Sequence, residues 1–210
     1  IYNKIPNNII AVTGTNGKSS IADFYYQILD LNNKKVASIG TLGIKSKKFK
    51  KDLSNTTIDP TQLSKILSNL KKQNINNVIM EASSHGLSQN RLDGLSFNTG
   101  IFTNLSQDHL DYHKNIKNYL KAKLYLFEKL IKKNGSIITD EKIPEFKKIK
   151  KIASNKNLNL FSLLDKKNNF QFLSHQFEDE SQLLEIRYNN SIHKIKLNLI
   201  GKVQLKNLLM

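Results

Sequence analysis

Short apolar runs alternate with amphipathic segments along most of this chain. The runs have the length of buried strands, whereas the segments between them repeat apolar residues every three or four positions, as helices do. Pro60 suits the first turn of a helix, and Gly135 suits the end of one. Strands are predicted at residues 7–14, 35–41, 76–84, 98–106, 136–140 and 158–163. Helices are predicted at residues 18–35, 60–74, 117–135 and 144–157, with a loop rich in Lys, Ser and Thr before the second helix.

This order of elements predicts an α/β fold, in which a mostly parallel sheet of the phosphate-loop type carries helices on both faces. Ligands bind such sheets beyond the carboxyl ends of the strands. From about residue 169 the pattern changes to three short alternating stretches, 170–177, 182–190 and 193–201. They predict a small antiparallel meander over residues 169–200. Residues 202–210 then have the pattern of the first turns of another helix.

Composition limits the possible chemistry. The 210 residues, 39% of them apolar, suffice for one substantial core, and the absence of cysteine excludes disulfides and thiolate metal sites. The longest apolar runs fall far short of the roughly 20 residues that a membrane span needs, and no signal peptide opens the chain. We therefore expect a cytoplasmic protein without membrane insertion. The missing start methionine and the short last helix suggest a piece of a longer protein.

The net charge of +16 raises the possibility of nucleic-acid binding. The charge comes from 31 Lys and 2 Arg, and the lysines are spread over many helix faces. Aromatic residues are not interleaved with them in a pattern that would stack on bases. We therefore expect no nucleic-acid partner, although a phosphate-loop module that binds nucleic acid remains the alternative from another functional class.

The first candidate site is the segment "VTGTNGKSS", residues 12–20, which joins a predicted strand to a predicted helix. It matches the phosphate-loop pattern G-x-x-x-x-G-K-[ST], except that Val12 replaces the first glycine. Gly14 and Gly17 allow close approach of the backbone, Lys18 suits the terminal phosphates, and Ser19 suits Mg²⁺. The segment predicts a nucleotide-phosphate site.

A second polar cluster, "MEASSHGLSQNR", covers residues 80–91 and follows another strand. Glu81 stands where a carboxylate could bind the Mg²⁺ of a nucleotide. Hydroxyl, imidazole, amide and guanidinium groups then follow on what we expect to be a single loop, and they suit an anionic substrate. These groups belong to Ser83, His85, Gln89 and Arg91.

A third cluster, "TNLSQDHLDYH", covers residues 103–113 and contains Asp108, His109, Asp111 and His113. A zinc site is conceivable here. With a phosphate loop elsewhere in the chain, His109 as a ligand of a second Mg²⁺ is the more economical interpretation. Asp111 and His113 also suit a simple role in capping the next helix.

Taken in order, "GTNGKSS", "NTT" at residues 55–57, the second and third clusters, "YLKAKLYLF" and "LIGKVQLKNLL" resemble the Mur ligase family. The resemblance covers the whole chain, 1–210, as the central ATP-binding domain of the family. "ASSHGL" followed by Gln and Arg is similar to the member that adds a diamino acid to UDP-N-acetylmuramoyl-L-alanyl-D-glutamate. The uridine-binding and amino-acid-binding domains of the family are not expected within these residues.

The resemblance implies an ATP site and two Mg²⁺ ions. The loop of this family lacks the first glycine as a rule, so Val12 is no defect. Glu81 and His109 match the family's magnesium ligands, and Ser19 joins them. The residues that match the ATP site are Gly14, Thr15, Asn16, Gly17, Lys18, Ser19, Ser20, Asn104, Gln204 and Asn207. Gln204 departs from the family pattern, which has asparagine there.

The resemblance also implies a substrate site and a modified lysine. Lys123 matches a lysine that the family carbamylates with CO₂, which turns a cation into an anion able to bind the second Mg²⁺. Lys18, Lys123 and His109 are the implied catalytic residues. The positions that match the substrate site are Asn55, Thr56, Thr57, Ser83, Gln89 and Arg91.

The implied reaction makes an amide through an acyl phosphate, in peptidoglycan biosynthesis. The expected partners are the UDP-N-acetylmuramoyl dipeptide and a diamino acid, with meso-diaminopimelate favoured over L-lysine, and we expect a monomer. The nearest alternative enzyme is another ligase of the same fold, such as a folylpolyglutamate synthase, because the phosphate loop alone is shared with that group. Without the other domains the chain is expected to be inactive.

Overall fold

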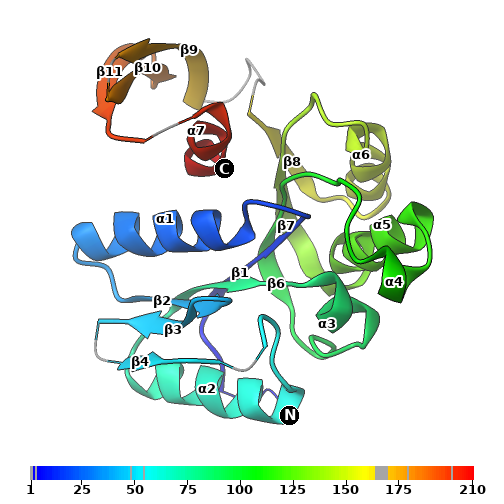
Figure 1. Ribbon diagram of the computed structural model, residues 1–210. Helices are drawn as coiled ribbons and strands as arrows, with labels where there is room; N and C mark the ends of the chain where they lie inside the picture. The colour runs from blue at the N-terminus through cyan, green and yellow to red at the C-terminus, as the bar shows by residue number, and fades with distance from the viewer. Residues whose placement is uncertain are drawn as a thin grey trace.

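The computed structural model of the chain describes residues 2, 4–47, 49–53, 55–163, 170–178, 180–199 and 201–210. Within these residues the central element is an eight-stranded sheet in the order β4-β3-β2-β5-β1-β6-β7-β8 (Figure 1). Its strands are β1 (Asn8–Thr13), β2 (Val36–Gly40), β3 (Gly43–Ser46), β4 (Phe49–Lys51), β5 (Asn77–Glu81), β6 (Phe97–Phe102), β7 (Ile131–Thr139) and β8 (Asn159–Ser162).

The pairs from β2 to β8 are all parallel, so the predicted mostly parallel α/β sheet is confirmed. The predicted loop before the second helix is wrong in part, because it contains β3 and β4. Strand β3 pairs with β2, and β4 pairs with β3, both in antiparallel orientation. A tight turn makes this return possible: Gly40 pairs with Gly43, whose φ of +82° suits glycine. These short strands are rich in lysine and form the edge of the sheet.

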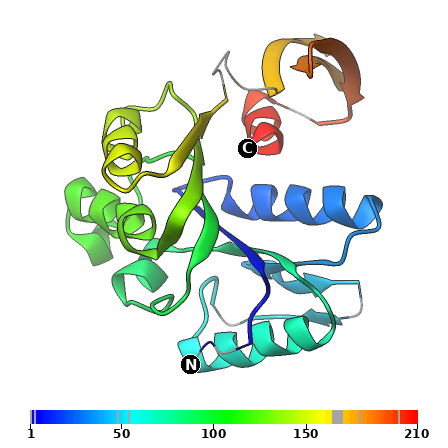
Figure 2. The same ribbon diagram turned by 180° about the vertical axis from the view of Figure 1, so that it is seen from behind.

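Helices cover both faces of the sheet, as predicted (Figures 1 and 2). Successive strand residues point to opposite faces, so Ile9 and Ala11 join the larger core, whereas Val12 joins a smaller one with Ile21. The larger core includes residues of α2, α3, α5 and α6, and the smaller one includes residues of α1. The helices are α1 (Lys18–Leu31), α2 (Pro60–Lys72), α3 (Ser84–Ser88), α4 (Leu110–His113), α5 (Ile116–Tyr125), α6 (Phe146–Asn155) and α7 (Lys202–Leu209).

The helix predicted for residues 117–135 is too long. Helix α5 continues into a π-helical turn, η1 (Leu126–Leu130), and the chain then enters β7 at Ile131, which pairs with Phe97. Asn134 has a φ of +58°, which a right-handed helix cannot accommodate. The amphipathic pattern continues past Leu130, but the pairing of Ile131 with the sheet ends the helix there.

The predicted meander is confirmed as β9 (Phe170–Glu178), β10 (Ser181–Tyr188) and β11 (Ser191–Leu197), in the order β11-β10-β9. Residues 169 and 200, the predicted limits of this subregion, lie outside the described residues. Leu184 and Ile186 of β10 pack with Leu205 of α7 in a third small core. None of the helices in the described part of the chain has the length and apolar character that crossing a membrane requires.

Candidate functional site

Three neighbouring strands, β5, β1 and β6, bring the predicted site segments to one edge of the sheet. In the parallel register Val12 pairs with Glu81, and Thr13 pairs with Phe102. The phosphate loop after β1, Glu81 at the end of β5 and the segment after β6 therefore start side by side. This is the carboxyl edge, where sheets of this kind bind ligands.

The loop after β1 has the backbone of an anion-binding turn. Gly14 has a φ of +148° and Gly17 a φ of +88°, conformations that favour glycine. A Cβ at Gly14 would overlap the Thr103 hydroxyl, so the close approach of these two segments also requires glycine. Gly17 is the N-cap of α1 and has no side chain to cap its first turn. The N–H groups of that turn are therefore available to an anion.

The segment after β6 holds the loop in place. Thr15 N and Asn16 N donate to the backbone oxygen and the side-chain oxygen of Asn104, at 2.9 and 3.0 Å. The Thr103 hydroxyl donates to Asn16 O at 2.6 Å. Asn104, predicted to contact ATP, is thus engaged with the backbone of the loop itself. Its direct contact with a nucleotide stays a prediction.

Lys18 lies over the loop. Its Nζ donates to the carbonyl oxygens of Gly14 and Thr15, at 3.1 and 2.8 Å. Burial lowers the pKa of Lys18, and the nearby carboxylate of Glu81 opposes that shift. Ser20 follows in the first turn of α1 and is half-buried. The ammonium group therefore lies against the loop that is predicted to hold the phosphates of a nucleotide.

Glu81 is a buried carboxylate, 2% exposed, that is surrounded by hydroxyl groups. Its Oε1 accepts from Thr41 N at 2.8 Å, and its Oε2 accepts from the hydroxyls of Ser19 and Thr41 at 3.0 and 3.1 Å. The oxygens of Ser19 and Glu81, both predicted magnesium ligands, are thus neighbours. A set of hard oxygen donors of this kind fits Mg²⁺.

Several predicted substrate residues connect to Glu81 through Thr57. The buried Thr57 hydroxyl donates to Glu81 O at 3.1 Å and accepts from Ser83 N at 2.9 Å. Arg91 Nη1 donates to Thr57 O at 2.8 Å, and the hydroxyls of Thr56 and Thr41 are 3.0 Å apart. The exposed Asn55 begins the same turn. The structure therefore gathers most of the predicted substrate residues around the end of β5.

The residues after Ser83 are a short helix rather than the expected single loop. The Ser83 hydroxyl accepts from Gly86 N at 3.1 Å and so caps α3. Gln89 follows this helix, and its Nε2 donates to the Tyr112 hydroxyl at 3.1 Å. Because N-cap residues accept bonds from the first turn, the Ser83 side chain already has a structural role.

His109 belongs to a cluster of rings between α3 and α4. Its backbone is left-handed, with a φ of +52°, and its Nε2 is 3.5 Å from the Asp108 carboxylate. Its ring meets His85 edge-on at 4.9 Å, while the buried His113 forms a 3.0 Å hydrogen bond from Nε2 to the Ser84 hydroxyl. Burial lowers the pKa of both His85 and His113.

The zinc alternative finds no support in this cluster. Across the described ranges no group of three or more His, Cys, Asp or Glu side chains is arranged to hold a metal ion. Asp111 lies in the first turn of α4, but no side-chain hydrogen bond caps that helix, and His113 is engaged with Ser84.

Lys123 is a buried lysine, 1% exposed, on α5. Its Nζ donates to Gly14 O at 2.7 Å and lies 4.3 Å from the centre of the Tyr119 ring. Burial, and after it the charge of Lys18, lowers the pKa of Lys123 to about 7. A large fraction of this amine is therefore neutral near pH 7, which is the form that reacts with CO₂.

Helix α7 brings the last two predicted ATP residues to the loop. Asn207 Nδ2 donates to Gln204 Oε1 at 3.3 Å. The Asn207 side chain is buried against Gly17, because a Cβ at Gly17 would lie 2.6 Å from Asn207 Oδ1. The two amides therefore stand beside the phosphate loop.

The family model of the Mur ligase middle domain matches residues 12–210. The chain belongs to this family. UDP-N-acetylmuramoyl-L-alanyl-D-glutamate--2,6-diaminopimelate ligase from Zymomonas mobilis is 36% identical over 208 residues, which cover 99% of this chain and 43% of the relative. The protein of the same name from Rickettsia montanensis is 39% identical over 212 residues, which cover 99% of this chain and 44% of that relative. The chain thus spans less than half the length of these relatives.

A solved structure of a UDP-N-acetylmuramoyl-L-alanyl-D-glutamate--2,6-diaminopimelate ligase has the same fold. It superposes with a TM-score of 0.83 at 28% identity, over 97% of this chain and 42% of that chain. The family resemblance expected from the motifs is therefore confirmed, as is the α/β fold.

Sequence reasoning missed three residues that shape this Mur ligase site. Thr41 holds the Glu81 carboxylate, and its position directly after β2 at the carboxyl edge could have identified it. Thr103 occupies the space beside Gly14. Tyr119 contacts Lys123 with its ring, and its hydroxyl lies 3.2 Å from Thr15 Oγ1. In the sequence Tyr119 falls in the apolar spacing of a helix, which does not indicate that its ring contacts Lys123.

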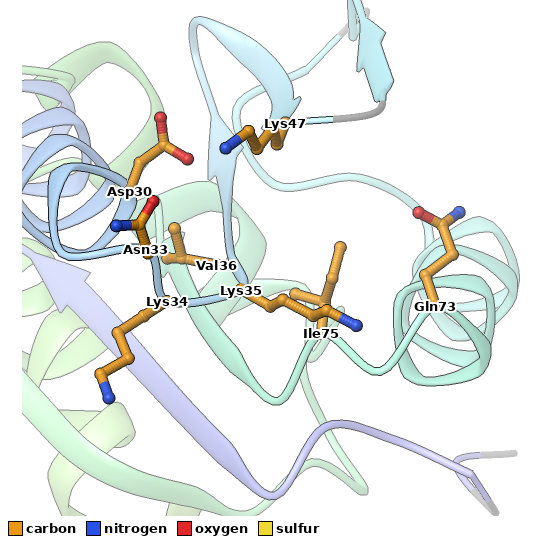
Figure 3. Close-up of a pocket in the computed structure, with 8 residues that line it drawn as sticks. All are labelled: Asp30, Asn33, Lys34, Lys35, Val36, Lys47, Gln73 and Ile75. Carbon is orange, nitrogen blue, oxygen red and sulfur yellow. The ribbon is translucent and has the colours of Figure 1, made fainter.

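A pocket of about 210 Å³ lies away from the Mur ligase site (Figure 3). Lys35 and Ile75, which line it, precede β2 and β5, so the pocket is at the amino edge of the sheet. Its lysines are exposed, and it contains none of the predicted site residues. Its position separates it from the phosphate loop.

Proposed function

We propose that the protein carrying this chain is an ATP-dependent ligase that adds meso-diaminopimelate to UDP-N-acetylmuramoyl-L-alanyl-D-glutamate. The observation that supports it most is the convergence of Lys18, the Ser19–Glu81 pair and the buried Lys123 on one phosphate loop. The names of the relatives support the choice of substrates. L-lysine is the alternative amino acid.

In this proposal the loop and α7 bind ATP. The backbone of residues 14–17 and the N-terminus of α1 hold the phosphates, with Lys18 neutralising their charge. Gln204 and Asn207 offer amide groups to adenine, and the side chain of Gln204 is longer than that of asparagine. Thr15, Asn16 and Ser20 line the same loop, and Asn104 fixes its shape.

Ser19 and Glu81 are the proposed ligands of one Mg²⁺, and His109 and carbamylated Lys123 are the proposed ligands of a second. The 3.0 Å contact between Ser19 Oγ and Glu81 Oε2 supports the first pair. When bound, Mg²⁺ neutralises charge on a transferring phosphoryl group. Lys123 fits carbamylation because its side chain is buried and its pKa is lowered to about 7, by burial first and by the charge of Lys18 second.

The substrate dipeptide is proposed to lie beyond β5. Asn55, Thr56 and Thr57 approach it from one side, and Arg91 supplies the positive charge. Arg91 is oriented by its bond to Thr57 O, and guanidinium groups pair well with carboxylates. Ser83 and Gln89 complete this set at the two ends of α3.

The chemistry forms an amide in two displacements. An oxygen of the D-glutamate side-chain carboxylate attacks the terminal phosphorus of ATP, and ADP leaves. The amine of the diamino acid then attacks the acyl carbon, a C–N bond forms, and phosphate leaves with that carboxylate oxygen. Lys18 stabilises negative charge that develops on the phosphoryl oxygens, which is the main demand of such a transfer.

We further propose that residues 1–210 form the central domain of this ligase, that separate domains bind uridine and the incoming amino acid, and that it acts as a cytoplasmic monomer. The relatives are more than twice as long as this chain, which supports further domains.

ADP release with the muramoyl dipeptide and meso-diaminopimelate tests the proposal. Folate with glutamate, assayed in parallel, tests the related folate ligase. Release only with the folate pair would overturn the proposed substrates, and salt-dependent DNA binding without any ADP release would favour the nucleic-acid module.

A further inference from the structure

Helix α7 is fastened to the main sheet by an ion pair next to the proposed adenine residues. Lys206 Nζ lies 2.7 Å from Asp140 Oδ2. Asp140 directly follows β7 at the carboxyl edge, two strands away from the phosphate loop. Figures 1 and 2 show α7 over this edge, between α1 and the β8 end of the sheet. The pair therefore connects the helix to the end of β7.

The Asp140 carboxylate is buried, and each of its oxygens has a partner. Its side chain is only 3% exposed, whereas that of Lys206 is 54% exposed. Its other oxygen, Oδ1, accepts from Lys142 N at 2.9 Å. A buried carboxylate is costly unless its oxygens are paired, so Asp140 favours the one placement of α7 that brings Lys206 to it.

Lys206 stands directly before Asn207 in the sequence, and the two point in different directions from α7. Asn207 packs against Gly17 of the phosphate loop, while Lys206 reaches toward the end of β7. Two contacts on different sides of one helix fix both its rotation and its position along its axis. Gln204 lies on the same side as Asn207, three residues earlier, and is fixed with it.

The remaining packing of α7 is against α1 and the meander. Leu205 shares a small core with Leu184 and Ile186 of β10. Met210, after the end of the helix, packs on the small core between α1 and the sheet. The ion pair adds a polar contact between α7 and the end of β7.

We propose that Asp140 and Lys206 form a latch that positions Gln204 and Asn207 for the base of the nucleotide. This inference rests on the proposed ATP site. The latch acts on the base and not on the phosphates, because the conformation of the phosphate loop is set by β1, α1 and the segment after β6. Asp140 and Lys206 are thus positioning residues that touch neither phosphate nor base.

Affinities for Mg²⁺-ATP and for inorganic tripolyphosphate, which has the phosphate chain but no base, test this latch in the protein carrying this chain. Asp140→Asn and Lys206→Met are expected to weaken ATP binding about tenfold, the effect of losing a charge-assisted hydrogen bond. Tripolyphosphate affinity is expected to stay within about twofold. Lys206→Arg keeps the charge and is expected to restore most of the ATP affinity.

Lys202→Met is the matched control, because Lys202 is an exposed lysine on the same helix. This substitution is expected to leave both affinities unchanged. The double variant Asp140→Asn/Lys206→Met leaves no buried unpaired charge, so it keeps the test valid if a single variant unfolds. Unchanged ATP affinity in the folded variants, or equal losses for both ligands, overturns the latch alone. A folded wild type that binds neither ligand overturns the proposed ATP site together with it.

Discussion

Lys18 and Lys123 donate to the same acceptor, the carbonyl oxygen of Gly14, at 3.1 and 2.7 Å. Two ammonium groups on one oxygen repel each other, and Lys123 is only 1% exposed, so water screens its charge little. Its pKa falls to about 7, through burial first and Lys18 second. Conversion of Lys123 to a carbamate would replace this repulsion by attraction, which links the phosphate loop to the proposed modification.

Carbamylation of Lys123 is expected to depend on pH. CO₂ reacts with the neutral amine, and a lysine is neutral above its pKa, so the reactive form is lost as the pH falls below about 7. With ¹³C-bicarbonate, a carbamate signal in the NMR spectrum should rise between pH 6 and pH 8 and be absent in Lys123→Met. A signal that appears only near pH 10 would contradict the lowered pKa of Lys123.

Lys123→Ala is expected to lower ligase activity about a hundredfold or more, because a proposed anionic ligand is lost. Acetate or formate is expected to restore part of the activity by occupying the space and supplying a carboxylate. The rescue should saturate with carboxylate concentration and should be absent when chloride replaces the carboxylate. Full activity of Lys123→Ala without any additive would rule out the carbamate.

Lys18→Ala is expected to reduce ADP formation by about a hundredfold or more, since this ammonium group stabilises charge on the transferring phosphoryl group. Lys34→Ala is the matched control, because Lys34 is an exposed lysine beside the pocket at the opposite edge of the sheet. Near-normal turnover in Lys18→Ala, with the control unchanged, would refute the assignment of the phosphate loop.

Thr57→Val is expected to destabilise the fold and disturb the end of β5. The substitution removes a hydroxyl that bonds both Glu81 O and Ser83 N in a buried position. Leaving two backbone groups unpaired is expected to lower the free energy of unfolding by about 2–4 kcal/mol. Thr57→Ser keeps both bonds, so chemical denaturation should show a much smaller loss in its free energy of unfolding. Equal stability of the two variants would argue against this role of the hydroxyl.

The sequence predicted the parallel sheet well, because its buried strands are short apolar runs between helices with clear periodicity. It failed where tertiary contacts override local pattern. Strands β3 and β4 have few apolar residues and exist because β3 pairs with β2 and β4 pairs with β3. The helix through Lys123 ends early because Ile131 joins the sheet, although the amphipathic pattern continues.

Within the site, the phosphate loop and Glu81 were predictable from residue types at strand ends. The burial of Lys123 was not, because its sequence neighbours are those of an exposed helix lysine, and only the resemblance singled it out. The pairing of Asp140 with Lys206, which lie 66 positions apart, has no local signal either.

The most direct test of the account follows one oxygen atom through the reaction. The muramoyl dipeptide is labelled with ¹⁸O in the side-chain carboxylate of D-glutamate and incubated with ATP, Mg²⁺ and meso-diaminopimelate. Because the carboxylate attacks the terminal phosphorus of ATP and phosphate then leaves with that oxygen, the released phosphate is expected to contain one ¹⁸O. Unlabelled phosphate, released together with the amide product, would contradict activation of the carboxylate as an acyl phosphate.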